Sequence, residues 1–129
     1  MSYAPTAKTI LLVDDHETNR RGFALMFTNA GYRVFEAADG EEGVRTAREQ
    51  QPDAIVMDLG MPGMDGMEAA RALRADPATA SIPIVALTGQ ALVRSWPELR
   101  AAGFDGYLTK PCEPHKVRAE VERLITKRV

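Results

Sequence analysis

The sequence predicts an α/β fold in which a parallel sheet is covered by helices on both faces. Short apolar runs of strand length alternate with longer segments of helical spacing, five of each along the 129 residues. The run at residues 54–57 has no polar alternation, which is typical of a strand buried on both faces. Gly and Pro residues interrupt the chain between these segments. We therefore expect five strands joined by right-handed helical crossovers in one domain.

The first half of the chain contains five predicted elements that follow a loose tail at residues 1–7. The first strand is a β-branched apolar run. The first helix places Phe23, Met26 and Phe27 on one face, and Gly31 is a typical helix stop. Acidic residues near position 41 favour the start of the second helix, where the helix dipole is positive. The predicted elements are a strand at 9–13, a helix at 17–30, a strand at 32–37, a helix at about 39–50 and a strand at 54–57.

The second half begins with a loop rich in Gly and Pro, which separates the third strand from the third helix. The sequence Ser95-Trp96-Pro97-Glu98 is a capping-box pattern, so we expect the fourth helix to begin near Trp96. Residues 89–94 then form a mobile loop before that helix. The other predicted elements are a helix at about 67–76, a strand at 84–87, a helix end at Gly103, a strand at 104–109 and a helix at 113–127.

The composition is that of one compact domain, predicted to span residues 8–129. A hydrophobic content of 45% is enough for a core. There is no apolar run of membrane-spanning length and no export leader, so we expect a cytoplasmic protein without membrane insertion. The formal net charge of -2 argues against direct binding to nucleic acid. Cys112 is the only cysteine, which excludes an internal disulfide and a multi-Cys metal site.

Polar residues end four of the five predicted strands. Each has an ordinary structural explanation: an Asp commonly caps a turn, a Thr ends a strand, and a Lys is solvated. However, the carboxyl ends of parallel strands lie at one edge of the sheet, where ligands bind in open α/β folds. Their joint occurrence therefore indicates one functional crevice. Its candidate residues are Asp14, Asp15, Asp58, Thr88 and Lys110.

Three clustered carboxylates repel one another unless a cation neutralises them, and Mg²⁺ prefers oxygen ligands of this kind. We expect Asp15 and Asp58 to bind Mg²⁺ directly and Asp14 to bind it directly or through water. The main-chain carbonyl of Gly60 is a further candidate ligand. The sequence therefore predicts a magnesium site that can also receive phosphate oxygens.

The other polar groups fit phosphoryl transfer, which needs positioning, a metal and donors to the phosphoryl oxygens. Lys110 offers a mobile cation and Thr88 a hydroxyl, and the backbone N–H groups of Leu59 and Gly89 are candidate donors. No Ser, His or Cys lies at the centre of the set. Asp58 is therefore the predicted nucleophile, forming an aspartyl phosphate.

Four blocks of the sequence, in this order and spacing, resemble the receiver domain of two-component response regulators. The resemblance covers residues 8–127, and the chemotaxis Y protein is the best-known single-domain type of this family. The blocks are Leu11-Leu12-Val13-Asp14-Asp15, the segment from Met57 to Gly66, Ala86-Leu87-Thr88-Gly89, and the segment from Ala102 to Pro111.

The resemblance implies a flavodoxin-like (βα)5 fold with strand order 2-1-3-4-5. It implies that Asp58 is the phosphoacceptor, beside the acidic pair Asp14 and Asp15, the Gly60 carbonyl and Lys110. Thr88 and Tyr107 are the implied switch residues, and the Lys110-Pro111 peptide bond is expected to be cis.

The implied partners are a histidine kinase or a histidine phosphotransfer protein, and a downstream target on the face of the fourth helix, last strand and terminal helix. The implied activity is that of a signalling phosphoacceptor, with its own phosphotransfer and autodephosphorylation, and not that of a separate enzyme. Residues Gly60 and Gln90 occupy positions that tune dephosphorylation in this family.

Three alternatives remain at this point. A phosphatase of the haloacid dehalogenase type needs a second Asp two residues after its nucleophile, where this chain has Gly60. A nucleotide-binding module needs a Gly-rich turn after the first strand, where this chain has Asp14 and Asp15. A pseudo-receiver would have the fold without being phosphorylated.

Asn19-Arg20 is also found in receivers of hybrid histidine kinases, so an excised kinase receiver is an alternative to a free-standing regulator.

Overall fold

The computed structural model describes residues 7–89 and 96–128, without the side chain of residue 128. Most of the predicted tail, residues 90–94 of the predicted loop and Ser95 of the predicted capping box lie outside the described residues. Gln90 lies outside them as well.

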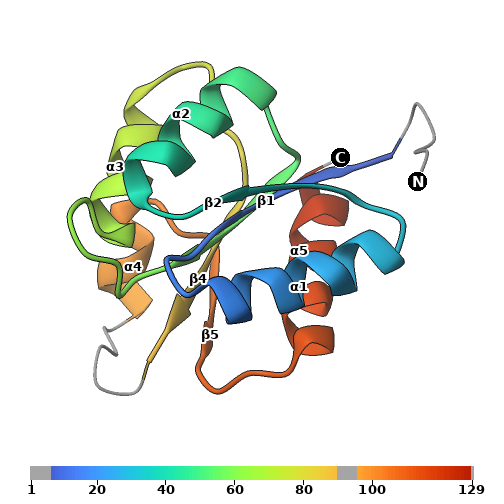
Figure 1. Cartoon of the computed structure of the whole chain (residues 1–129). Helices are drawn as coiled ribbons and strands as arrows, with labels where there is room; N and C mark the ends of the chain where they lie inside the picture. Colours follow the sequence, from blue (N-terminus) through green and yellow to red (C-terminus); the bar gives the residue numbers. More distant parts are fainter. Residues whose placement is uncertain (1–6, 90–95, 129) are drawn as a thin grey trace.

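Five parallel strands form one sheet in the order β2-β1-β3-β4-β5, which confirms the predicted flavodoxin-like topology (Figure 1). Each strand pairs with its neighbours over four or five residues. The strands are β1 (Thr9–Val13), β2 (Arg33–Ala37), β3 (Ala54–Asp58), β4 (Ile84–Thr88) and β5 (Gly106–Thr109).

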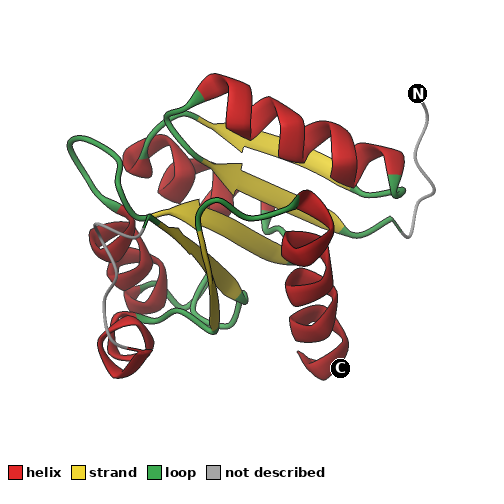
Figure 2. Cartoon of the chain, turned by 90° about the horizontal axis from the view of Figure 1, so that it is seen from below, coloured by secondary structure: helices red, strands yellow, loops and turns green. Residues whose placement is uncertain are grey.

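Five helices cover the two faces of the sheet, α1 and α5 on one and α2, α3 and α4 on the other (Figures 1 and 2). Successive strand residues point to opposite faces, so the apolar strands supply two cores. Leu11, Ile55 and Ile84 pack toward α2, α3 and α4, whereas Leu12 and Val56 pack toward α1 and α5. The helices are α1 (Glu17–Asn29), α2 (Gly40–Gln50), α3 (Gly66–Ala75), α4 (Trp96–Ala102) and α5 (Pro114–Arg128).

Two acidic residues have a structural role at helix starts. Asp39 accepts a hydrogen bond from the Glu42 N–H at 2.8 Å, and Asp65 accepts one from the Glu68 N–H at 2.9 Å. Both are N-caps, which satisfy backbone donors that a helix leaves free in its first turn. These carboxylates therefore stabilise α2 and α3 and are distinct from those at the ends of β1 and β3.

The first residues of two predicted strands belong to the preceding helix ends. The N–H of Tyr32 donates to Phe27 and the N–H of Phe104 donates to Leu99, so both residues close a helix and precede their strand. The predicted strands at 32–37 and 104–109 therefore begin at Arg33 and Gly106. Gly31, with φ of 97°, ends α1 as predicted.

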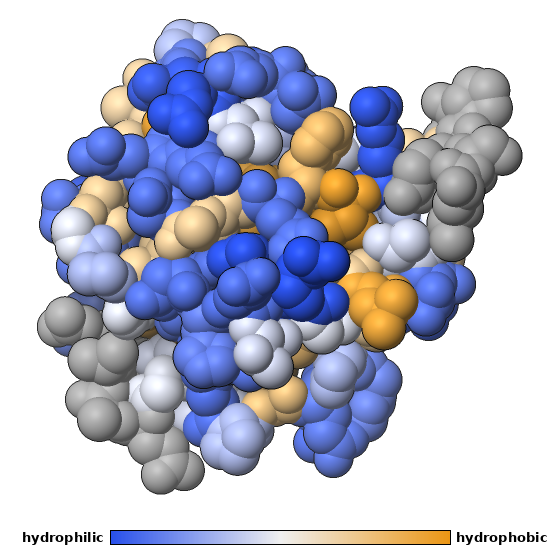
Figure 3. Space-filling model, in the orientation of Figure 1, coloured by the Kyte–Doolittle hydropathy of each residue, from blue (hydrophilic) through white to orange (hydrophobic). Residues whose placement is uncertain are grey.

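The face of the molecule in Figure 3 carries mainly hydrophilic residues, with hydrophobic ones in small patches among them. None of the described helices has the length and apolar character needed to cross a bilayer.

Candidate functional site

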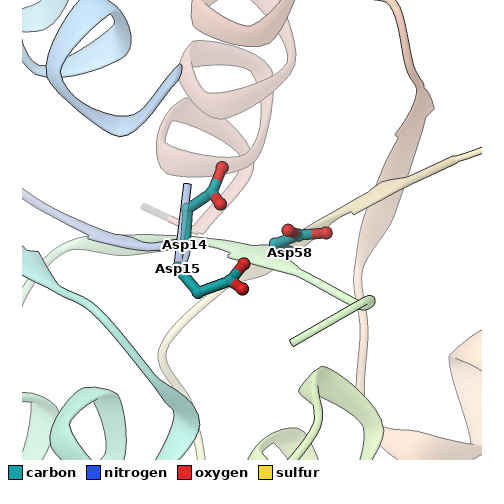
Figure 4. Close-up of side chains that lie close together, drawn as sticks. All are labelled: Asp14, Asp15 and Asp58. Carbon is teal, nitrogen blue, oxygen red and sulfur yellow. The ribbon is translucent and has the colours of Figure 1, made fainter. Parts of the chain in front are cut away.

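Strand register brings two of the predicted carboxylates together. Val13 of β1 is paired with Met57 of β3, so Asp14 and Asp58 follow as neighbours on the same face of the sheet. Asp15 is the next residue along the chain. One oxygen of each carboxylate lies within 4.8 Å of one oxygen of the other two. Figure 4 shows the three side chains gathered at the ends of these strands.

Asp58 is only 6% exposed, and each of its carboxylate oxygens has a donor. Lys110 Nζ lies 3.1 Å from Asp58 Oδ2, and the Gly60 N–H donates to Oδ1 at 3.1 Å. A carboxylate with a donor on each oxygen is held in a fixed orientation. Asp58 is therefore the carboxylate at which the acidic cluster and the lysine meet.

The N–H of Leu59 does not face this carboxylate. It donates to the carbonyl of Leu87 at 3.0 Å and so continues the pairing of β3 with β4. The role of the Leu59 N–H as a phosphoryl donor stays a prediction, because in this structure the sheet uses that group. The N–H of Gly60, one residue further, is the backbone donor beside Asp58.

Asp14 gives the test of whether a cation fits here. Its Oδ1 accepts a hydrogen bond from the His16 N–H at 2.8 Å, but its buried Oδ2 has no hydrogen-bond partner among the described residues. Burial raises the pKa of the Asp14 carboxyl; the His16 N–H lowers this pKa and the charge of Asp58 raises it. An orphaned carboxylate oxygen beside two further carboxylates is a donor set that suits a hard divalent cation such as Mg²⁺.

Thr88 and Tyr107 lie on one face of the sheet near the same edge. Tyr107 is paired with Ala86, two residues before Thr88, so their side chains are diagonal neighbours. Thr88 is fully buried and its hydroxyl lies 3.3 Å from the Gly89 carbonyl. Tyr107 is 44% exposed, and its ring centroid lies 5.6 Å from that of Trp96.

The connection after β5 positions Lys110. Its N–H donates to the Thr88 carbonyl at 2.7 Å, which extends the pairing of β4 and β5 up to the acidic cluster. The Lys110-Pro111 peptide bond is cis, as the resemblance implies.

A cavity of about 670 Å³ elsewhere, lined by Trp96 and Phe104 among others, does not include any of the predicted site residues.

Residues 10–122 match the family model of the response regulator receiver domain, which covers most of the chain. The chain belongs to the response regulator receiver family. As a receiver domain, it has the role of a phosphoacceptor in signalling.

Known receivers of several kinds are similar to this one. PilH of Pseudomonas aeruginosa is 37% identical over 106 residues, which are 81% of this chain and 86% of PilH. The polar-differentiation response regulator DivK of Brucella anthropi is 32% identical, covering 81% of this chain and 85% of DivK. The chain spans about half the length of a longer relative, the transcriptional regulatory protein AfsQ1 of Streptomyces coelicolor (34% identity; 91% of this chain, 51% of AfsQ1).

Solved receiver structures superimpose closely on this fold. The receiver domain of the sensor histidine kinase PA1611 of Pseudomonas aeruginosa has 37% identity and a TM-score of 0.84, covering 94% of this chain and 99% of that one. That structure is described with a magnesium ion coordinated in its active site cleft. The chemotaxis protein CheY4 of Vibrio cholerae has 31% identity and a TM-score of 0.84, covering 92% and 99%. Membership of this family does not favour the phosphatase and pseudo-receiver alternatives.

Two features of the receiver site have no counterpart in the sequence prediction. Gly66, the first residue of α3, lies so close to β3 that an added Cβ would be 2.6 Å from the Asp58 carbonyl oxygen. Arg20 of α1 donates a hydrogen bond to the main-chain carbonyl of Asp14. The loop rich in Gly was a sequence signal for the first feature. The second depends on how α1 packs, which no local pattern encodes.

Proposed function

We propose that Asp58 accepts a phosphoryl group from a phosphohistidine of a histidine kinase or histidine phosphotransfer protein in the cytoplasm. The observation that carries this proposal is the position of Asp58, in contact with Lys110 on one side and beside Asp14 and Asp15 on the other. These three carboxylates and the Gly60 carbonyl are the groups that would hold Mg²⁺. When bound, Mg²⁺ supplies positive charge that offsets the carboxylates and the phosphoryl oxygens.

In the proposed transfer, an oxygen of Asp58 forms a bond to phosphorus as the bond from phosphorus to the partner's histidine nitrogen breaks. That nitrogen keeps the electron pair. Lys110 follows the phosphoryl oxygens as they replace its contact with Oδ2, and the N–H of Gly89 donates to them together with the N–H of Gly60. In autodephosphorylation, a water oxygen forms a bond to phosphorus as the bond from phosphorus to the Asp58 oxygen breaks, which restores the carboxylate and releases inorganic phosphate. The residues at positions 60 and 90 set its rate.

The proposed switch starts from the weak contact of the Thr88 hydroxyl with the Gly89 carbonyl. A phosphoryl oxygen on Asp58 is a stronger acceptor, so the hydroxyl turns toward it. Tyr107, exposed on the same face of the sheet, then moves into the space beside Thr88. The face formed by α4, β5 and α5 changes in shape, which alters its affinity for a downstream target.

The proposal is tested with acetyl phosphate, a small phosphoryl donor, and Mg²⁺. Intact mass spectrometry of the wild type should show the addition of one phosphoryl group. Asp58→Asn should abolish the addition, because an amide is not a nucleophile for this transfer. The matched control is Glu41→Gln, which makes the same chemical change at an exposed carboxylate of α2 and should be phosphorylated like the wild type. Unphosphorylated wild-type protein would support the pseudo-receiver alternative instead.

A further inference from the structure

Arg20 links the acidic cluster to the first helix and the edge strand. We propose that Arg20 and Glu36 act as a positioning pair that fixes the main chain of Asp14 and thereby sets the Mg²⁺ affinity of the receiver site. This inference rests on the Mg²⁺ site of the proposed function. It assigns a role to two residues that are neither predicted Mg²⁺ ligands nor predicted to contact the phosphoryl group.

The guanidinium of Arg20 is divided between two elements. Its Nη1 donates to the Asp14 carbonyl oxygen at 2.8 Å, and its Nε donates to Glu36 Oε1 of β2 at 2.9 Å. The Arg20 side chain is only 14% exposed. A planar guanidinium presents its donors in a rigid fork, so both bonds together define where the Asp14 carbonyl lies.

The main-chain N–H and carbonyl of Asp14 and one of its side-chain oxygens are all hydrogen-bonded. Its N–H donates to the Ala37 carbonyl at 3.1 Å, and Oδ1 accepts from the His16 N–H at 2.8 Å. With Arg20 on the carbonyl, Oδ2 is the one polar atom of Asp14 that has no partner among the described residues. The contacts therefore aim that oxygen toward the carboxylate cluster.

The Arg20 contact is important because Asp14 lies where the chain leaves the sheet. β1 ends at Val13 and α1 begins at Glu17, so a three-residue connection carries Asp14 and Asp15. Without Arg20, the peptide unit that joins Asp14 to Asp15 can rotate, which changes the direction of the Asp15 carboxylate relative to that of Asp14. Ligands displaced by about 1 Å bind and react much less well, and groups that orient metal ligands typically contribute 10–100-fold to affinity.

Because Glu36 is the partner of Arg20, the pair affects the cation site by positioning Asp14 more than by adding charge. Its carboxylate offsets the Arg20 charge at 2.9 Å, so the pair brings little net charge to the cation site. Arg21 offers a natural comparison: it carries the same charge and lies 3.8 Å from the other oxygen of Glu36, but it is 67% exposed. Among the hydrogen bonds of the described residues, Arg21 makes none with Asp14.

The test is Mg²⁺ binding to the unphosphorylated protein by isothermal titration calorimetry, with circular dichroism to show that each variant is folded. We expect Arg20→Gln to weaken Mg²⁺ binding roughly 10–100-fold. Arg21→Gln, the matched control, should stay within about twofold of the wild type, because an exposed charge at this distance is screened by salt. Arg20→Lys should remain weak, because a single ammonium does not reproduce the fork.

Glu36→Gln is the second variant, which leaves Arg20 in place but removes its partner. It should weaken Mg²⁺ binding less than Arg20→Gln does. Because Arg20 is still present, this variant tests the pair even if Arg20→Gln fails to fold. Equal affinities in Arg20→Gln and the wild type would overturn the positioning role alone. Equal losses in Arg20→Gln and Arg21→Gln, or full rescue by Arg20→Lys, would also overturn it, since charge would then explain the effect. Absence of Mg²⁺ binding in the wild type would overturn the magnesium site and this inference together.

Discussion

At the scale of single residues, the carboxyl group of Asp14 couples stability to cation binding. It is 3% exposed, and burial raises its pKa above the ordinary value of 3.8. The folded state therefore binds this proton more tightly than the unfolded chain does. Without a divalent cation, stability falls as the pH rises from the unfolded pKa through the folded pKa, and the full penalty persists above it.

We therefore expect Asp14→Asn to be more stable than the wild type at pH 7 in EDTA, by about 1–3 kcal/mol, since the variant removes a buried, poorly paired charge. The difference should shrink toward pH 4, where the wild-type carboxyl gains its proton. Adding Mg²⁺ should stabilise the wild type and leave the variant almost unchanged. Urea unfolding of both proteins at pH 7 and pH 4 in EDTA, and at pH 7 with Mg²⁺, measures this.

Asp15→Asn is the control for the Asp14 substitution, because Asp15 belongs to the same cluster but is exposed. Its stability in EDTA should stay within about 0.5 kcal/mol of the wild type. A variant Asp14→Asn that is less stable than the wild type at pH 7 in EDTA would contradict the account of the buried charge.

At the scale of elements, the close approach of α3 to β3 fixes the loop that follows Asp58. An added Cβ at Gly66 would meet the Asp58 carbonyl oxygen at 2.6 Å and the Leu59 Cα at 3.0 Å. Both are backbone atoms, which cannot move aside as a flexible side chain can. We expect Gly66→Ala to destabilise the fold by about 1–3 kcal/mol and to slow phosphorylation by acetyl phosphate, because α3 must shift away from the site.

Gly22 of α1 is the matched position for that experiment. An added Cβ there meets nothing within 4 Å, and the residue lies inside a helix. Gly22→Ala should therefore stabilise the protein by about 0.5–1 kcal/mol and leave the phosphorylation rate unchanged. Chemical denaturation and mass spectrometry of the two variants side by side would show whether close packing or loss of any glycine controls the site.

The elements themselves were largely predictable, because alternation of apolar runs and helical segments reflects burial directly. The residues at which strands begin were less predictable. Phe104 is apolar and buried like a strand residue, but its N–H closes α4 through Leu99, so β5 begins two residues later. Composition does not distinguish these two uses of a buried aromatic residue.

The candidate site was predictable to the extent that it follows from topology. Parallel strands end at one edge, so the residues after β1 and β3 converge whatever the details of packing. The hydrogen bond of the Leu59 N–H could not be predicted because it depends on register: the pairing of Asp58 with Leu87 extends by one more hydrogen bond. The Arg20 contact was missed because it depends on the angle at which α1 crosses the sheet.

At the scale of the whole molecule, the proposed switch must carry a change at Asp58 across β4 to the outer face of β5 and α4. Trp96 is the only tryptophan and begins α4, with its ring centroid 5.6 Å from that of Tyr107. It also packs against the core between the sheet and α2, α3 and α4. A movement of Tyr107 toward Thr88 therefore removes the ring contact on one side of the Trp96 indole and exposes the indole to water.

We expect beryllofluoride with Mg²⁺, a phosphoryl mimic, to shift the fluorescence emission of Trp96 to longer wavelength. The shift should be absent in Asp58→Asn, where the mimic has no carboxylate to bind. Tyr107→Ala has already lost the ring contact, so its emission should start at longer wavelength and change little on adding the mimic. If Tyr107→Ala responds as fully as the wild type, α4 moves independently of Tyr107, and the coupling through the two rings is wrong. A response confined to the wild type would mean that the ring pair transmits the state of Asp58 to the face that a target contacts.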